Sequence, residues 1–435
     1  MLVRKHAPPD DLVIRGARVI DPAEGIDAVL DVIIDQGVIT RRESSDSSRQ
    51  NGHRVIEGAG LVLAPAFVDP HVHLRVPGRE DEETIASGTA AAAAGGFCAI
   101  LAMPNTDPVV DSAAVLGALV EDARAEAEIP VGFLAAITKG QLGAELTEMA
   151  ELADAGAVAF SDDGRPVVSP GLMRRALQYA SVTGLKLALH CEEPTLSRGG
   201  HMHEGAVSAE LGFGGYPSIA ESVMVERDLA LAAYEDRPLH LLHLSARESV
   251  DALRAARAAG VEATAEVTPH HLCLTDDAVR SLDPNVKMNP PLRSPADREA
   301  LIDALCDGTI SAIATDHAPH ARHEKEVPFE AAPFGVTGLE TAFAALYTNL
   351  VDTGAIPLET ILERMSAGAA RAYGLDEPRI AVGATANLVL LDLNATARVT
   401  EETFQSRSAN SWLLGETLRG KVRLTIADGL VAFEG

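Results

Sequence analysis

Short apolar segments alternate with longer amphipathic segments through the middle of the chain. Apolar runs of a few residues predict buried strands, and apolar positions repeating every three to four residues predict helices. The first such strand, at residues 61–75, ends in polar residues. Further strands are expected at 97–103, 131–137, 157–161, 185–190, 239–244, 261–267 and 310–314, with helices at 84–94, 112–126, 146–155, 171–182, 219–234, 249–259, 339–351 and 358–373.

About eight strands in this alternation indicate an α/β protein with a TIM-type (β/α)8 barrel. The helix expected at 358–373 would pack outside that barrel. The competing fold is a doubly wound open sheet. No G-x-G-x-x-G sequence follows a predicted strand to support it.

Both ends of the chain show a different pattern, with short strands separated by turns. Strands are expected at 12–14, 17–20, 29–34 and 37–39, and again at 386–392 and 422–433, where Asp428-Gly429 predicts a hairpin turn. The polar segment 41–53 is expected to be a loop. These features predict one small β-sandwich domain, residues 1–64 plus 376–435, with the barrel, residues 65–375, inserted between its halves.

Polar residues stand where the first central strand ends. Side chains at alternate positions of a strand point the same way, so His71 and His73 project together. Two imidazoles so placed suit one metal ion.

Other predicted strands end in similar residues, and the active sites of such barrels lie at the carboxyl ends of the strands. The residues at those ends include Asn105 after the second strand, Asp162 and Asp163 after the fourth, His190 after the fifth, His243 after the sixth and Asp316 after the eighth. Four histidines and two carboxylates meeting on one rim predict a two-metal hydrolytic site.

Each of these residues also has an ordinary interpretation. A single histidine at a strand end is commonly a packing residue, an Asp-Asp-Gly sequence is a plain turn, and Asp316 alone could cap a helix. His201 and His203 lie in a glycine-rich segment away from any strand, so they are not expected to bind metal. His270 and His271 are expected to support the site or the fold rather than to be ligands.

Composition and charge limit the partners. The chain has 435 residues, 47% hydrophobic and 23% charged, and a formal net charge of -27, which disfavours nucleic acid and membrane surfaces. An anionic substrate would need local cations. Four scattered cysteines and no apolar leader or membrane-spanning run predict a cytoplasmic protein without disulfides.

The segments HVHLR, MPNT, SDDG, KMNPPLR and ATDHAPH together resemble the amidohydrolase superfamily and, within it, the bacterial type I dihydroorotases. The resemblance extends over essentially the whole chain. It implies two zinc ions, the first held by His71, His73 and Asp316 and the second by His190 and His243. Local sequence leaves open whether Asp162 or Asp163 bridges them, and the family pattern favours Asp163.

The resemblance also implies a substrate site. Arg75 would pair with a substrate carboxylate, Asn105 and His320 would add hydrogen bonds, and Asn289 would contact the substrate ring. The full set of implied substrate-binding residues is His73, Arg75, Asn105, Asn289, His320, Phe334 and Gly335. The charged segment 321–334 is expected to act as a lid.

The implied reaction interconverts dihydroorotate and N-carbamoyl-L-aspartate in de novo pyrimidine biosynthesis. A hydroxide bridging the metals would attack the ring carbonyl, and Asp316 would act as acid and base. The alternatives are a hydantoinase or allantoinase, whose substrates lack the ring carboxylate, and a non-catalytic subunit of aspartate transcarbamoylase. The sequence leaves open a homo-oligomer and an association with aspartate transcarbamoylase.

Overall fold

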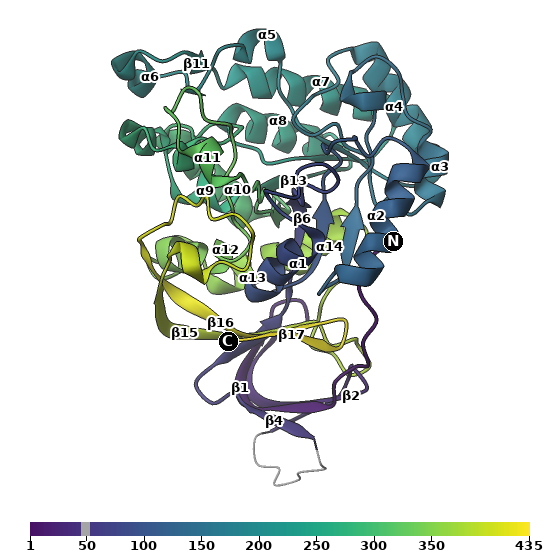
Figure 1. The fold of residues 1–435 in the computed structure, drawn as a ribbon, viewed down its shortest axis with the longest axis vertical. Helices are drawn as coiled ribbons and strands as arrows, with labels where there is room; N and C mark the ends of the chain where they lie inside the picture. Colours follow the sequence, from purple (N-terminus) through teal and green to yellow (C-terminus); the bar gives the residue numbers. More distant parts are fainter. Residues whose placement is uncertain (45–52) are drawn as a thin grey trace.

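The computed structural model describes residues 1–44 and 53–435 and divides into a β sheet and a larger α/β unit (Figure 1). The sheet lies below the α/β unit in Figure 1, and both chain ends enter it. The loop expected at 41–53 lies partly outside the described residues. Its first residues instead extend a strand, which runs from Val38 to Ser44.

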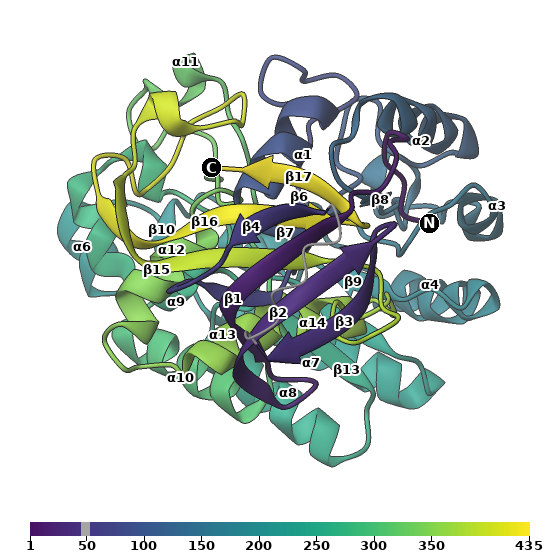
Figure 2. The ribbon, with the colours of Figure 1, turned by 90° about the horizontal axis from the view of Figure 1, so that it is seen from below.

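Within the described residues, eight strands form a sheet in the order β17-β16-β15-β5-β1-β2-β3, with β4 beside β1. Figure 2 shows the strands from the two chain ends, purple and yellow, side by side. Their bounds are β1 Leu12–Asp21, β2 Ile26–Asp35, β3 Val38–Ser44, β4 Arg54–Glu57, β5 Val62–Pro65, β15 Leu388–Arg398, β16 Thr417–Ala427 and β17 Leu430–Glu434. The predicted turn at Asp428-Gly429 is confirmed, because it joins β16 to β17.

The two strands expected at 12–14 and 17–20 are one strand, β1. Its register with β2 shifts between Ile14 and Ala17, around Gly16 at a positive φ of 66°. Glycine adopts this backbone conformation without the steric cost that a side chain brings. The apolar pattern is therefore interrupted while the strand continues through a bulge.

Seven parallel strands form the centre of the α/β unit. They are β6 Phe67–Val72, β7 Phe97–Ala102 and β8 Val131–Phe133 in one sheet, and β9 Leu187–Leu189, β12 Leu239–Leu241, β13 Ala263–Val267 and β14 Ala312–Ile313 in another. Isolated parallel bridges join the sheets at both ends, through Phe160 on one side and from His317 to Val72 on the other.

The strand expected at 157–161 is reduced to these bridges at Phe160. Its backbone still connects both neighbours, since Ser161 N donates to Ala135 O (2.9 Å) and Ala188 N donates to Phe160 O (2.8 Å). Strand order thus follows chain order around the centre of the unit, and all the pairs are parallel.

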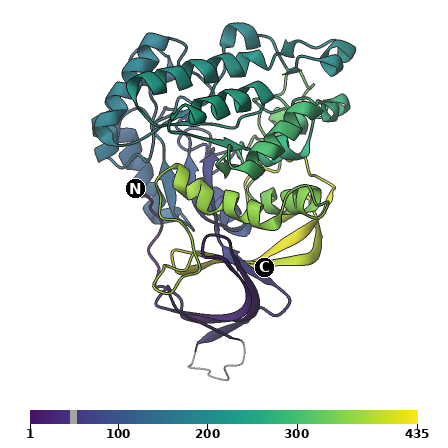
Figure 3. The ribbon, with the colours of Figure 1, turned by 180° about the vertical axis from the view of Figure 1, so that it is seen from behind.

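Helices surround these strands (Figures 1 and 3). They are α1 Ile85–Ala94, α2 Ala113–Glu126, α3 Met149–Asp154, α4 Pro170–Thr183, α5 Pro194–Ser197, α6 Ala206–Leu211, α7 Ile219–Glu235, α8 Arg247–Ala258, α9 Pro269–Cys273, α10 Pro295–Asp307, α11 Arg322–Lys325, α12 Ala342–Leu346, α13 Leu358–Met365 and α14 Ala367–Ala372. The remaining short elements are β10 Met202–His203, β11 Gly215–Tyr216, 3-10 turns at Lys139–Gln141, Asp276–Ser281, Pro284–Val286 and Glu401–Thr403, and a π turn at Tyr347–Val351.

Several helices differ from expectation, among them the short helices α5, α6, α9 and α11, which were not expected. The helix expected at 339–351 begins at Ala342 and changes to a π turn after Leu346. The helix expected at 358–373 is broken at Ser366, whose backbone is not helical and whose hydroxyl donates to Ala66 O (2.7 Å). The sequence analysis missed α10, although Ser294 caps it and forms a capping box with Asp297.

Two large hydrophobic cores stabilise the fold. One buried cluster comprises side chains of β1, β2, β3, β5, β15 and β16, including Leu12, Val32 and Leu390, together with two from the segment before β15. A larger cluster fills the α/β unit and also includes side chains of the sheet, among them Val62 and Leu391. Each fully buried Leu, Ile or Val contributes about 1.5–3 kcal/mol, so the larger core also holds the sheet against the α/β unit. No helix within residues 1–44 and 53–435 has the length and apolar character of a membrane span.

Candidate active site

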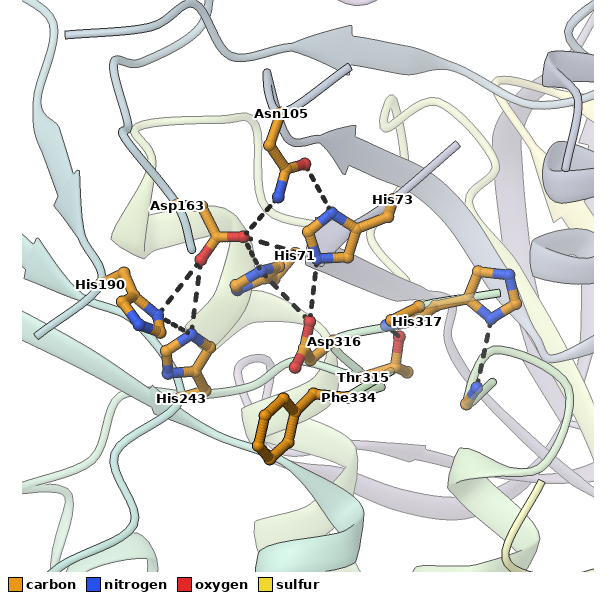
Figure 4. A network of polar contacts seen from close by, with 12 residues as sticks. His71, His73, Asn105, Asp163, His190, His243, Thr315, Asp316, His317 and Phe334 are labelled. Carbon is orange, nitrogen blue, oxygen red and sulfur yellow. Dashed lines mark hydrogen bonds and ion pairs between the residues drawn. The ribbon is translucent and has the colours of Figure 1, made fainter. Parts of the chain in front are cut away.

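The residues predicted to hold metal meet at one end of the parallel strands. His71 lies in β6 and His73 directly follows it, His190 follows β9, His243 lies two residues beyond β12, and Asp316 lies three beyond β14. The carboxyl ends of parallel strands share one edge, and Figure 4 shows these side chains pointing toward one another.

Asp163 lies between two pairs of histidines. Its Oδ2 is 3.6 Å from His71 Nε2 and 3.5 Å from His73 Nε2. Its Oδ1 is 3.6 Å from His190 Nδ1 and 3.5 Å from His243 Nε2. All five side chains are buried, and each pair with Asp163 forms a group close enough to hold a metal ion.

Asp316 joins the first pair. Its Oδ1 is 3.1 Å from His73 Nε2 and 3.4 Å from His71 Nε2. Asp316 has a positive φ of 48°, and so does His243, at 30°. Non-glycine residues adopt this conformation at a cost, and such residues concentrate at functional sites.

Asp162 points away from this cluster. Its Oδ1 accepts hydrogen bonds from the backbone of Ile137 (2.8 Å) and Thr138 (3.1 Å), and its Oδ2 accepts one from the Thr138 hydroxyl. Burial raises the pKa of Asp162 to about 6, although the hydrogen bonds from Thr138 oppose the rise. Asp162 therefore fixes the turn, and its neighbour Asp163 faces the histidines.

Hydrogen bonds select which ring nitrogen of two histidines faces Asp163. His71 Nδ1 is 2.7 Å from Glu266 Oε1, which leaves Nε2 toward the cluster. His190 Nε2 is 2.9 Å from Glu192 Oε2, which leaves Nδ1 toward the cluster. A carboxylate behind the imidazole fixes its tautomer in many metal sites.

Several buried atoms of the cluster lack an ordinary hydrogen-bond partner. Within the described residues, His71 Nε2 and Asp163 Oδ1 accept or donate no hydrogen bond of normal geometry. Such orphaned polar atoms are rare in folded proteins. Imidazole nitrogens and carboxylate oxygens aimed at one another fit a metal ion between them.

The pKa values of Asp163 and His71 are shifted in opposite directions within the cluster. Burial would raise the pKa of Asp163, but the interactions with His71, His243 and His73 together lower it well below its usual range. Burial would lower the pKa of His71, yet the Asp163 and Asp316 carboxylates raise it well above its ordinary value. A divalent cation would supply the positive charge and displace the His71 proton.

The predicted substrate residues lie around this cluster in three places. Asn105 joins it directly, with Oδ1 2.9 Å from His73 Nδ1 and Nδ2 donating to Asp163 Oδ2 (3.3 Å). Asn289 lies beside the second histidine pair, where its Nδ2 donates to Glu192 Oε2 (3.0 Å).

Arg75, His320, Phe334 and Gly335 form the third group. An Arg75 guanidinium nitrogen is 3.5 Å from His320 Nε2, which is 2.8 Å from Phe334 O. Gly335 has a positive φ of 118°, and an added Cβ would lie 2.7 Å from Ala318 Cβ. Glycine is thus required where the loop turns against His320.

The other histidine pairs do not join the metal cluster. His271 lies between the Thr268 hydroxyl (2.7 Å) and Pro290 O (3.0 Å), and its neighbour His270 is buried beside it. His201 Nδ1 is 3.4 Å from Lys287 Nζ, and His203 Nδ1 is 3.3 Å from an Arg293 nitrogen. The positive charges of Lys287 and Arg293 disfavour metal binding at His201 and His203.

Two residues of this network were missed by the sequence analysis. Glu266 is a charged residue inside the buried strand β13, an anomaly visible in the sequence ATAEV. Its other oxygen is 2.9 Å from His240 Nε2. Glu192 is two positions after His190, in the segment that follows β9.

The chain is similar to known proteins over nearly its whole length. A family model described as dihydro-orotase-like matches residues 60–249. The dihydroorotase of Geobacter metallireducens is 44% identical over 424 residues, covering 98% of this chain and 100% of that protein. The dihydroorotase of Pelotomaculum thermopropionicum is also 44% identical, covering 97% of this chain and 98% of that protein.

Solved structures show the same fold at lower identity. L-hydantoinase (dihydropyrimidinase) from Arthrobacter aurescens has a TM-score of 0.87 at 24% identity, covering 98% of this chain and 96% of that one. Dihydropyrimidinase from Brevibacillus agri has a TM-score of 0.83 at 23% identity, covering 97% of this chain and 94% of that one.

The fold and the histidine–carboxylate cluster define an α/β protein of the TIM-barrel class, with the architecture of the hydantoinase-type amidohydrolases. The full-length relatives narrow this class further. The chain belongs to the dihydroorotase family.

Proposed function

We propose that this protein is a zinc-dependent dihydroorotase that interconverts dihydroorotate and N-carbamoyl-L-aspartate in pyrimidine biosynthesis. Full-length relatives named dihydroorotase support the reaction. The observation that carries the proposal is the position of Asp163, whose two oxygens each lie 3.5–3.6 Å from one pair of histidines.

The donor set fits two zinc ions per chain. His71, His73 and Asp316 would hold the first, His190 and His243 the second, and Asp163 would lie between them. Imidazole and carboxylate are the ligands that zinc takes in hydrolytic sites. When bound, the metal ions would lower the pKa of a water molecule to about 7 and polarise the substrate carbonyl.

Asp316 would move the proton in this reaction. Burial would raise its pKa, but the positive charge of His71 and the hydrogen bond with His73 lower it below the usual range. The carboxylate is thus deprotonated and able to accept the proton of the attacking water. It would then deliver that proton to the ring nitrogen as the amide bond breaks.

Arg75 would recognise the substrate carboxylate. Burial lowers the pKa of Arg75, although the Glu82 carboxylate opposes this, and its guanidinium lies against His320. A guanidinium can bind a carboxylate through two parallel hydrogen bonds. His73, Asn105, Asn289, His320, Phe334 and Gly335 would complete the substrate site.

The alternative is a hydantoinase, which the solved structures with the same fold favour. Its substrate has no ring carboxylate, so the Arg75 guanidinium, which pairs with Glu82 (3.1 Å), would have no substrate carboxylate to bind there. A non-catalytic subunit of aspartate transcarbamoylase is disfavoured because every predicted ligand is present in the cluster.

An ultraviolet assay of ring opening separates these functions. Dihydroorotate should be cleaved and hydantoin should not, and activity should vanish on chelation and return with zinc. Cleavage of hydantoin in preference to dihydroorotate would overturn the proposed substrate. A chain that holds no zinc and cleaves neither compound would support the non-catalytic function.

We also propose the finer architecture. The strands joined by the bridges at Phe160 and His317 would close an eight-stranded barrel, residues 65–375. The sheet of residues 1–64 and 376–435 would fold over its own core as a β-sandwich. The unpaired cysteines support a cytoplasmic setting. Light scattering, alone and with aspartate transcarbamoylase, would measure any assembly.

A further inference from the structure

Glu192 joins two parts of the site that lie on different segments. A single oxygen, Oε2, is 2.9 Å from His190 Nε2 and accepts a hydrogen bond from Asn289 Nδ2 (3.0 Å). Its other oxygen accepts a hydrogen bond from Ser197 in α5. The side chain is 16% exposed, so most of this network is shielded from water.

The contact with His190 determines which nitrogen that ring presents. Because Nε2 donates to Glu192, Nδ1 carries the lone pair and lies 3.6 Å from Asp163 Oδ1 and 3.0 Å from His243 Nε2. The negative charge of Glu192 also makes the imidazole a stronger donor to a metal.

The contact with Asn289 determines which way that amide points. Because Nδ2 is turned to Glu192, Oδ1 is left as a buried acceptor, and it has no hydrogen-bond partner within the described residues. A buried acceptor of this kind is costly unless a ligand satisfies it. Ring N–H groups of a cyclic amide are donors of the required kind.

We propose that Glu192 is a positioning residue that sets the His190 tautomer for the second metal ion and turns Asn289 Oδ1 toward a ring N–H of the substrate. The inference rests on the proposed function for its substrate half. Through one oxygen, Glu192 links metal affinity to substrate affinity, although it touches neither the metal nor the substrate.

The test compares Glu192→Ala with Glu193→Ala. Glu193 is the next residue and is half-buried, and its carboxylate caps α5 through Thr195 N (3.0 Å). Zinc affinity is measured by chelator competition without substrate, and KM and kcat for dihydroorotate are measured at saturating zinc.

E192A should weaken binding of one of the two zinc ions by about 10–100-fold and raise KM by about fivefold. E193A should match the parent protein in zinc affinity and in KM. In a double mutant, E192A should raise KM no further once Asn289→Ala is present, because the two residues act through one contact. An E192A protein that matches E193A in zinc affinity or in KM would overturn the inference.

Glu192→Gln keeps both hydrogen bonds with a neutral acceptor. The KM of E192Q should lie close to that of the parent protein, while its zinc affinity should remain lower than that of the parent protein. If E192A does not fold, E192Q decides the inference, and unchanged zinc affinity there would overturn it. Failure of the parent protein to cleave dihydroorotate would contradict the proposed function, while the zinc measurement would still test Glu192.

Discussion

At the residue scale, the site places one carboxylate between two imidazole pairs and a second against the first pair. In the proposed reaction Asp316, whose Oδ1 lies 3.1 Å from His73 Nε2, would serve as both ligand and proton carrier. These two roles depend on the same negative charge. They can be separated only by measuring metal content and turnover on the same sample.

We predict that Asp316→Asn lowers kcat by about 10²–10⁴-fold, the usual contribution of a positioned acid or base. Zinc at the first pair should also bind more weakly, because an amide oxygen carries no charge. Zinc content and dihydroorotate turnover check both. Substantial turnover with full zinc would contradict the role given to Asp316.

Arg75 gives a second prediction at this scale. Arg75→Gln removes the cation proposed to bind the substrate carboxylate, so KM for dihydroorotate should rise by about 10–100-fold, the effect of losing a charged hydrogen bond. Zinc content should not change. Steady-state kinetics at saturating zinc measure the effect, and an unchanged KM would place the carboxylate elsewhere.

The sequence predicted the residues that stand at strand ends, because strand alternation and the shared edge of parallel strands locate them. It could not choose between Asp162 and Asp163 from adjacent positions. The hydrogen bonds from Thr138 and Ile137 that turn Asp162 away come from a segment about 25 residues earlier. Glu266 was missed because its partner His71 is far away in the chain.

At the element scale, the segment after β14 is held by a buried lysine. Lys287 Nζ donates to the carbonyl oxygens of Phe329 (2.8 Å), Glu330 (3.0 Å) and Ala332 (2.8 Å). It also lies 4.8 Å from the centre of the Phe334 ring. The segment expected to act as a lid is therefore anchored just before Phe334.

We predict that Lys287→Met lowers the free energy of unfolding by about 1–3 kcal/mol, because three carbonyls lose a shared donor. Trypsin should then cleave faster after the exposed Arg322. Lys139→Met, at an exposed lysine paired with Glu145, is the matched control. Equal cleavage rates in the two variants would show that Lys287 does not anchor the segment.

Periodicity located most helices but not their internal breaks. The helix expected at 358–373 is interrupted at Ser366 because its hydroxyl binds Ala66 O, a contact across 300 residues. The strand expected at 157–161 survives only as bridges, since its length depends on its neighbours. The capping residues of α10 were present in the sequence and were overlooked.

At the scale of the whole molecule, α12 of the α/β unit packs against strand β16 of the sheet. Glu340, just before α12, lies at this junction and accepts hydrogen bonds from the backbone of Gln405 (2.9 Å) and Ser406 (3.0 Å). It lines a cavity that Phe343, Leu418 and Val422 also line. Burial raises the pKa of Glu340 to about 7, against the effect of those hydrogen bonds.

A raised carboxyl pKa stabilises the protein at low pH and not at high pH. The folded protein retains the Glu340 proton between pH 4.5 and about 7, while the unfolded chain loses it. The free energy of unfolding should therefore fall by roughly 1–3 kcal/mol across this range. Urea unfolding at pH 5 and 8 measures the fall, and Glu340→Gln should reduce it. If the free energy of unfolding of E340Q falls by the same amount, the pH dependence comes from other groups.

The central claim is that Asp163 lies between two zinc ions. Anomalous diffraction at the zinc edge from crystals of the zinc-loaded protein tests it most directly. Two peaks are predicted, one beside His71, His73 and Asp316 and one beside His190 and His243, with Asp163 between them. Peaks elsewhere, or no peak at this cluster, would contradict the account.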